Sequence, residues 1–355
     1  MVDFYTVKSG DTLYGISRKT GIPVDSLVKY NNLDPNGILS INTKLRLSPS
    51  HDIQMSRDVS DVDIERQKYV TEKPNPNHIV KSGDNLSKIA QKYGVDVNVL
   101  MHVNQLTKES ILRLDQELKI PPTKLVKNIN NLSDVAKAMG VSQEFLKDLK
   151  LIEDGKKPDG KPYGDNEFHN TPYVDKTGNK TIGIGHVVKK GEKEELTNRE
   201  VLETFTKDLL RMEENIQILL GSKQKYDALP QSMKEALLDM VFNKGPKILN
   251  EDMLNALRDG DYEAAINEMT NNKSAGGKEL SGLSKRRLFD ISTACKMYNG
   301  NIPKSNLETA QQVYNRGIEL LRQECGSEQV FKNVLVGYNQ DVQKFFGDKI
   351  KLITE

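Results

Sequence analysis

The sequence predicts a multidomain α+β protein: two small β-α-α-β modules, then a mainly α-helical domain with a small β-hairpin lobe and a C-terminal helical extension. Three observations support this fold class. At 355 residues the chain is longer than one hydrophobic core usually organises. A segment near the amino terminus occurs twice. Beyond residue 150 the apolar residues follow helical spacing, interrupted by one pair of short extended runs.

The repeat defines the two small modules. Thr6 to Leu13 (TVKSGDTL) recurs as Ile79 to Leu86 (IVKSGDNL), and apolar residues match at the same offset well beyond that run. Each copy predicts a strand, a Ser-Gly-Asp turn, two short helices and a closing strand. We assign the modules to residues 1–49 and 77–122.

Both modules resemble the LysM family, through YTVKSGDTLYGISRKTG and HIVKSGDNLSKIAQKYG. The resemblance implies that backbone groups beside the first turn bind N-acetylglucosamine-containing polymers. An alternative stays open, in which the glycines only permit the turn and the two aspartates only cap the next helices. The implied binding residues are Gly10, Asp11, Thr12, Leu13, Gly83, Asp84, Asn85 and Leu86.

Two connecting segments surround the second module. Residues 50–76 are polar, lack periodicity and end in Pro-Asn-Pro, so they predict an extended linker. Asn131 to Ser142 parallels the helices of the repeat without its strands, so residues 123–150 predict a helical bridge.

A carboxylate at the end of the next predicted helix is the first candidate for catalysis. Phe145, Leu149 and Ile152 form an apolar stripe, Gly155 ends the helix, and Glu153 falls in the last turn. The negative helix end and the neighbouring Ile152 should both raise the pKa of Glu153. A general acid needs that property.

A predicted β-hairpin supplies the second candidate group. Extended runs flank the turn Lys-Thr-Gly-Asn. If the turn centres on Gly178, Asp175 and Thr181 lie opposite each other on one face of the hairpin. A carboxylate and a hydroxyl would then hold one water molecule, as inverting glycoside hydrolysis requires.

Residues 144–300 resemble the phage-type lysozymes of T-even bacteriophages. The resemblance rests on YVDKTG followed by TIGIGH, on LPQSMKEALLDMVFNKGP and on SKRRL. It implies a lysozyme domain at 151–302 that cleaves the β-1,4 bond between N-acetylmuramic acid and N-acetylglucosamine without metal or cofactor. The implied roles are general acid for Glu153, water activation for Asp175, its hydroxyl partner for Thr181, and support near the cleft for His186 and Arg286. His186 is equally compatible with a structural hydrogen-bonding role.

One departure from the family concerns the spacing between the two carboxylates. Glu153 and Asp175 are separated by an apparent insertion, KKPDGKPYGDNEFHN, which predicts a loop beside the cleft. Asp154, Asp165 and Glu167 therefore compete for a catalytic role. The spacing from Asp175 to Thr181 does match the family.

The last segment, residues 303–355, is helical in character and lies outside the lysozyme resemblance. We expect it to pack on the helical domain, with docking to a phage tail or injection apparatus as the alternative. Cys295 and Cys325 have no ligand spacing for zinc, and a disulfide between them is not required.

Composition excludes other function classes. The net charge is +1, which gives no electrostatic drive toward nucleic acid or anionic lipid. No run approaches the ~18 apolar residues of a membrane span. The start MVDFYTVKSGDTL lacks a signal-peptide pattern, so we expect synthesis in the cytoplasm and access to the wall by lysis, a pore or a tail apparatus.

Two alternative functions stay open. The chain is either an anchored wall hydrolase, as a phage endolysin or a tail-associated lysozyme, or an inactive wall-binding structural protein. The altered spacing between Glu153 and Asp175 supports the second function, an inactive wall-binding protein. A chitin-type glycosidase is a further alternative, because N-acetylglucosamine occurs in both polymers.

Overall fold

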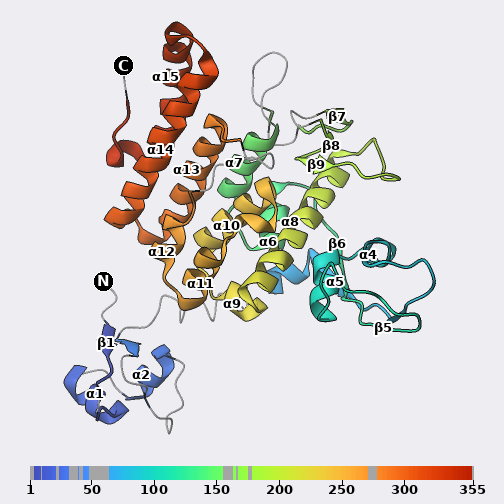
Figure 1. Cartoon of the computed structure of the whole chain (residues 1–355), viewed down its shortest axis with the longest axis horizontal. Helices are drawn as coiled ribbons and strands as arrows, with labels where there is room; N and C mark the ends of the chain where they lie inside the picture. Colours follow the sequence, from blue (N-terminus) through green and yellow to red (C-terminus); the bar gives the residue numbers. More distant parts are fainter. Residues whose placement is uncertain are drawn as a thin grey trace. The chain divides into compact units, whose positions relative to one another are not determined.

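The computed structural model describes residues 4–8, 10–20, 24–31, 39, 43–47, 64–154, 163–164, 167–174, 178–270 and 278–353. Figure 1 shows the whole chain. It divides into two compact units, residues 1–64 and 65–355, and each is described by itself. None of the described helices is both long enough and apolar enough to cross a membrane.

The first unit contains the first β-α-α-β module. Its elements are β1 (Phe4–Thr6), α1 (Leu13–Thr20), α2 (Val24–Asn31) and β2 (Lys44–Arg46). β1 and β2 pair antiparallel, with Phe4 opposite Arg46. The apolar residues shared by the repeat form the small core, namely Val7, Leu13, Ile16, Leu27 and Leu45. The predicted module is confirmed.

The second module has the same order of elements within the second unit. It comprises β4 (His78–Ile79), α4 (Leu86–Tyr93), α5 (Val97–Val103) and β5 (Glu117–Leu118), with β4 and β5 antiparallel. Gly94 ends α4 in the left-handed conformation at φ 65°. The core again consists of the matched apolar positions, including Ile89, Leu100 and Leu118.

The segments around this module differ from the prediction. Residues 64–67 are helical, and β3 (Val70–Lys73) pairs antiparallel with β6 (Thr123–Val126). The second half of the predicted linker is therefore structured. The predicted helical bridge begins with a strand, β6. Residues 51–63 of the predicted linker lie outside the described residues. Val70 is buried in the large core, and this burial holds an otherwise polar segment as a strand.

The remainder of the second unit is mainly helical, with one small sheet. α6 (Leu132–Met139) and α7 (Gln143–Asp154) form the predicted helix pair. The sheet has three antiparallel strands instead of a lone hairpin, in the order β7 (Tyr173–Val174), β8 (Lys180–Ile182), β9 (His186–Val187). The helical lobe contains α8 (Asn198–Leu220), α9 (Lys223–Asp227), α10 (Gln231–Lys244), η1 (Pro246–Ile248), α11 (Glu251–Asp259), α12 (Tyr262–Asn267), α13 (Ser281–Cys295) and η2 (Lys296–Tyr298).

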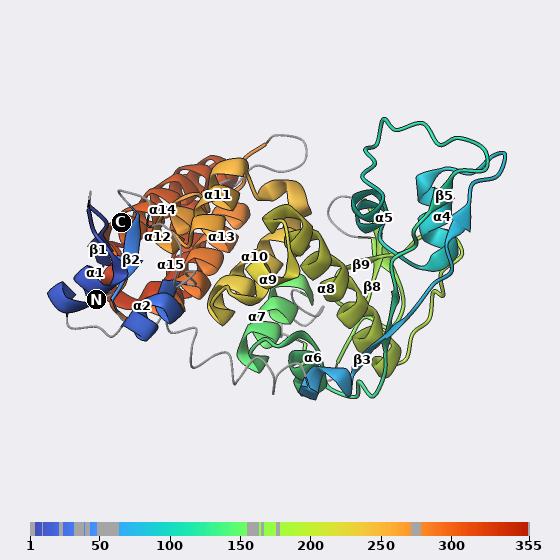
Figure 2. The same ribbon diagram turned by 90° about the horizontal axis from the view of Figure 1, so that it is seen from below.

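The C-terminal segment packs on this lobe. α14 (Lys304–Cys325), α15 (Glu328–Phe346) and η3 (Gly347–Lys349) follow η2, and α13, α14 and α15 run side by side (Figure 2). Val313, Tyr314, Phe331 and Val342 join the same hydrophobic core as the lobe. Cys295 and Cys325 are both free thiols. The extension therefore supports α13 from outside.

Candidate active site

Glu153 lies where α7, α10, α13 and the turn between β8 and β9 meet. Its Oε1 is 2.6 Å from Nη1 of Arg286 on α13. A side chain at Gly185 would come within 3.1 Å of both Glu153 Oε2 and the ring of Phe242 on α10. Gly185 has φ +70°, so its lack of a side chain provides both the turn and the close approach. The small sheet thus reaches the carboxyl group directly.

Burial controls the ionisation of Glu153. Removal from water raises the pKa of Glu153 above its ordinary value, and the charge and hydrogen bond of Arg286 oppose that rise without cancelling it. The predicted direction is confirmed, but its cause differs. Ile152 is 38% exposed and is not part of a buried stripe, so the enclosure comes from other elements. Gly155 lies outside the described residues.

Asp239 of α10 shares the arginine with Glu153. Nε and Nη2 of Arg286 each donate to one carboxylate oxygen of Asp239, both at 2.9 Å. Asp239 is fully buried. Our sequence reasoning missed this residue, although a lone carboxylate inside the apolar run LLDMVF was a usable signal, because buried charges occur where they are paired.

The competing carboxylates differ from Glu153 in their surroundings. Asp154 is buried in an ion pair with Lys150 at 2.6 Å, and Lys150 also donates to the carbonyl of Gly164. The contact from Lys150 to Gly164 ties the middle of the predicted insertion to α7. Glu167 is exposed and accepts from the backbone of Gly164 at 2.6 Å. Asp165 lies outside the described residues.

The sheet register corrects one step of the prediction. Tyr173 lies opposite Thr181, and Val174 lies opposite Lys180. The residue directly across from Thr181 is therefore Tyr173, and not Asp175 as a turn centred on Gly178 requires. Thr181 is 3% exposed and lies on the central strand β8. Asp175 itself lies outside the described residues.

His186 on β9 is held between two carboxylates. Its Nδ1 is 2.7 Å from Asp208 of α8, and its Nε2 is 3.1 Å from Glu192. Burial lowers the pKa of His186, but Asp208 and Glu192 outweigh it and the net direction is upward. Both ring nitrogens are therefore occupied. This geometry favours the structural role over direct contact with a ligand.

The repeated turns use their polar side chains internally. Asp84 accepts from the backbone of Lys81 at 2.8 Å and contacts His78, and Asp11 accepts from the backbone of Lys8 at 2.8 Å. The helix caps are the next residues, since Asn85 caps α4 and the hydroxyl of Thr12 accepts from Gly15. The expectation that the aspartates themselves cap the helices is wrong. Their carboxylates close the turns instead.

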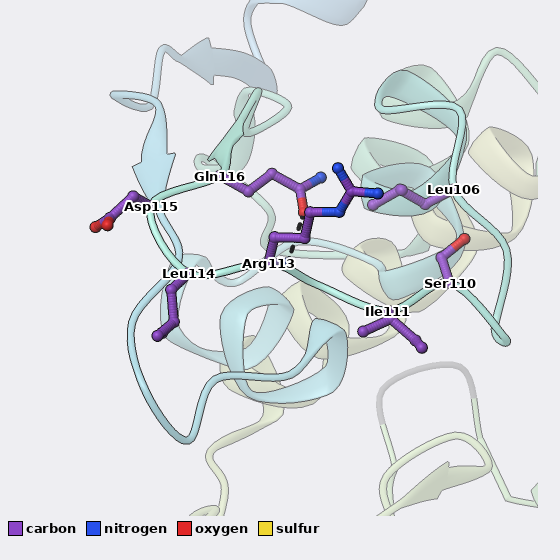
Figure 3. Close-up of a pocket in the computed structure, with 7 residues that line it drawn as sticks. All are labelled: Leu106, Ser110, Ile111, Arg113, Leu114, Asp115 and Gln116. Atoms are coloured by element: carbon purple, nitrogen blue, oxygen red, sulfur yellow. Dashed lines mark hydrogen bonds between the residues drawn. The ribbon is translucent and has the colours of Figure 1, made fainter.

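A shallow hollow of about 610 Å³ lies on the second module, between α5 and β5 (Figure 3). Ile111 and Leu114 line it and are 87% and 66% exposed. Ser110, Arg113 and Gln116 add polar groups. This loop is not among the predicted binding residues, although its apolar residues stand outside any predicted helix or strand, which was the available signal.

A helical lobe, a small sheet and a buried carboxyl group between them define a lysozyme-like glycoside hydrolase domain. Comparison with known protein families assigns this domain and the two small modules. Residues 166–289 match the phage lysozyme family, and residues 5–48 and 78–121 match the LysM domain. The chain thus carries two LysM domains and a phage lysozyme domain.

Individual relatives cover parts of the chain. It is 33% identical over 159 residues to the probable peptidoglycan endopeptidase LytE of Bacillus subtilis, covering 45% of this chain and 44% of that protein. The chain spans less than half the length of the curated relatives it matches.

Two solved structures resemble the chain at low identity. The active form of the P1 phage endolysin Lyz is 17% identical, with a TM-score of 0.38, and the match covers 48% of this chain and 96% of that one. The muramidase domain of SpmX from Asticcacaulis excentricus is 21% identical, with a TM-score of 0.33, covering 43% and 96%.

Proposed function

We propose that the chain hydrolyses the β-1,4 bond between N-acetylmuramic acid and N-acetylglucosamine in peptidoglycan, with Glu153 as the general acid. The main support for this proposal is the environment of the Glu153 carboxyl group. The Glu153 carboxyl group is enclosed and held by Arg286 at the junction of sheet and helices, in surroundings that favour its protonated form. A carboxylic acid protonated near neutral pH is suited to donate a proton to a leaving glycosidic oxygen.

Asp175 and Thr181 complete the proposed mechanism. In this mechanism Asp175 activates a water molecule, Thr181 helps to orient it, and attack opposite the leaving group inverts the anomeric centre. Their support is the sequence resemblance and the position of Thr181 on the central strand, next to the turn that reaches Glu153. NMR of the first products tests the stereochemistry, and retention at the anomeric centre would contradict this assignment.

The Glu153→Gln variant is the central experiment. It keeps the shape of the side chain and removes the proton donor, so we expect hydrolysis to fall by about 10²–10⁴-fold. The rate is measured as loss of turbidity of a peptidoglycan suspension. Mass spectrometry of the products should find reducing N-acetylmuramic acid ends with the wild type.

A matched control is Glu144→Gln on the same helix. Glu144 lies in the first turn of α7, exposed, in a surface contact with Lys296, and its loss should leave the rate unchanged. A wild-type protein that binds peptidoglycan but cuts nothing would favour an inactive wall-binding protein. Cleavage of chitin in preference to peptidoglycan would favour the chitin-type alternative.

We also propose that the LysM modules anchor the enzyme on the wall glycan, with the hollow at residues 106–116 as one binding surface. Ile111 exposes much of its apolar side chain to water, so a ligand that covers this side chain gains binding free energy from its burial. Ile111→Ser should therefore weaken binding to insoluble peptidoglycan by about tenfold, a loss of about 1.4 kcal/mol.

Sedimentation of the protein with washed peptidoglycan measures that loss. Ile79→Ser is the matched control, because Ile79 is also an exposed isoleucine of the second module but lies outside the hollow. Equal loss of binding in both variants would remove the support for the hollow. The finer assignment to a phage endolysin or a tail-associated lysozyme stays a proposal on sequence resemblance.

A further inference from the structure

Four buried ionisable groups, Arg286, Asp239, Arg287 and Asp290, lie behind the proposed general acid Glu153. Glu153 contacts Arg286 at 2.6 Å, and Arg286 makes two hydrogen bonds of 2.9 Å to Asp239. The next residue of α13, Arg287, pairs at 2.9 Å with Asp290, which lies one turn further along the helix. Asp239, Arg287 and Asp290 are at most 1% exposed.

The two buried aspartates cannot ionise equally. Burial raises the pKa of Asp290 well above its ordinary value, and the neighbouring Asp239 carboxylate adds to that rise. Burial also opposes ionisation of Asp239, but the charge and hydrogen bonds of Arg286, with a hydrogen bond from Asp290, hold its pKa below the ordinary value. Asp239 is thus the charged member and Asp290 the neutral one.

We propose that Asp239 is a positioning residue for the reaction: it holds Arg286 with two hydrogen bonds and balances its charge, so that Arg286 orients Glu153 without depriving it of the proton it must donate. This inference rests on the proposed role of Glu153 as general acid. Asp239 contacts Arg286 and acts through it.

The geometry explains why the balance matters. An unopposed guanidinium close to a carboxyl group lowers the pKa of that group by about 1–3 units. Such a shift would leave Glu153 ionised over much of the pH range in which it must be protonated. Asp239 occupies Nε and Nη2 of Arg286, so Nη1 is the nitrogen that faces Glu153.

The other charged groups near Glu153 do not replace Asp239. Among the residues that the structure describes, Arg286 of α13, Asp239 of α10 and Asp154 of α7 are the groups whose charges act most strongly on Glu153. Asp154 is balanced by its own partner, Lys150. The close contact from the β8–β9 turn is Gly185, which carries no charge.

Asp239→Asn tests the proposal through the pH dependence of hydrolysis. Asparagine keeps the size of the side chain and removes its charge, so Glu153 should lose its proton at lower pH. We expect the alkaline limb of the kcat/KM profile to move down by about 1–3 pH units. The acidic limb should stay in place, because it reports the proposed base.

Asp290→Asn is the matched control on the same network. Burial raises the pKa of Asp290 well above its ordinary value, so an amide in its place should change no charge near Arg286, and the alkaline limb should stay where the wild type has it. An unmoved limb in Asp239→Asn, with folding verified by thermal unfolding, would overturn the proposal. Equal shifts in both variants would also overturn it, because they would point to a general disturbance of the core.

A second measurement does not depend on the folding of a variant. In the wild-type protein with ¹³C-labelled carboxyl groups, NMR should find Glu153 titrating above about 4.3, the ordinary glutamate pKa, while Asp239 stays ionised from pH 4 to 9. A protonated Asp239 at pH 6 would contradict the inference. Failure of the proposed function would look different, since the wild type would then release no reducing ends at any pH.

Discussion

The pairing of His186 with two carboxylates makes the stability of the protein depend on pH. Asp208 and Glu192 hold the pKa of the folded imidazole above its ordinary value of about 6.5. The protonated form therefore stabilises the fold below the unfolded pKa. This contribution is lost as pH rises through the higher folded pKa.

His186→Gln should lower the free energy of unfolding by about 1.5–3 kcal/mol at pH 5.5, the usual worth of a hydrogen bond to a charged group. The difference from wild type should shrink as pH rises through the raised pKa of the folded His186. Urea unfolding at a series of pH values measures it. His102→Gln is the control, because His102 is exposed on α5 and should give a small, flat difference. If the loss of unfolding free energy in His186→Gln grew with pH, the stabilising form of His186 would not be the protonated one.

The sequence predicts the environment of some single residues better than that of others. The direction of the Glu153 pKa was predictable from its place at a helix end, but the enclosing groups come from α10, α13 and a turn far along the chain. In the described part of the sequence, η1, α11 and α12 lie between the helices that carry Asp239 and Arg286. Their hydrogen bonds depend on tertiary packing, which local patterns do not encode.

The contact between α13 and α14 depends on one glycine. A side chain at Gly317 would meet the hydroxyl of Tyr338 on α15 and would come within 2.9 Å of Ser284 on α13. Gly317→Ala should therefore destabilise the protein by about 1–3 kcal/mol, as overpacking of a core does. Thermal unfolding monitored by circular dichroism measures the change.

Gly337→Ala provides the matched control on α15. No atom lies within 4 Å of the position its new side chain would take. Because alanine favours a helix over glycine, this variant should be stabilised by about 0.5–1 kcal/mol. If both substitutions stabilised the protein, the close approach of α13 and α14 would be wrong.

At the scale of elements, the sequence predicted helices better than strand pairs. The repeat located α4 and α6, and helical spacing located α7, because these signals lie within each segment itself. The β3 strand was missed since its partner β6 lies beyond the whole second module, and only Val70 hints at burial. The register of β7 and β8 differs from the predicted one, and such a difference changes which residues face each other.

The second LysM module belongs to the same compact unit as the lysozyme domain, and a buried ion pair holds the strand segment that leads into it. Arg66 binds Glu213 of α8 through both of its terminal nitrogens, one of them at 2.8 Å. Glu213 is 1% exposed. Lys124 of β6 adds a contact to Glu214, and Asn98 of α5 donates to Asn215 of α8. Three neighbouring residues of one helix thus fix the module.

This arrangement predicts that Glu213→Gln loosens the second module without dismantling the lysozyme core. Leaving Arg66 without its buried partner costs about 3–5 kcal/mol. Hydrogen exchange should become faster by at least about tenfold in β3 and β6, whereas amides of α10 and α13 keep their protection. Hydrolysis of short soluble glycan fragments should persist, and clearing of intact wall should slow, because a loose module no longer holds the wall glycan at a fixed place beside the catalytic domain.

Glu203→Gln on the same helix separates this effect from a general loss of charge. Glu203 pairs with Arg199 at 2.9 Å at the surface, and such a pair contributes about 0–1 kcal/mol. It should leave exchange and wall clearing unchanged. If Glu213→Gln instead accelerated exchange evenly throughout residues 65–355, the module and the lysozyme core would unfold as one cooperative body, and the anchor could not move without the enzyme.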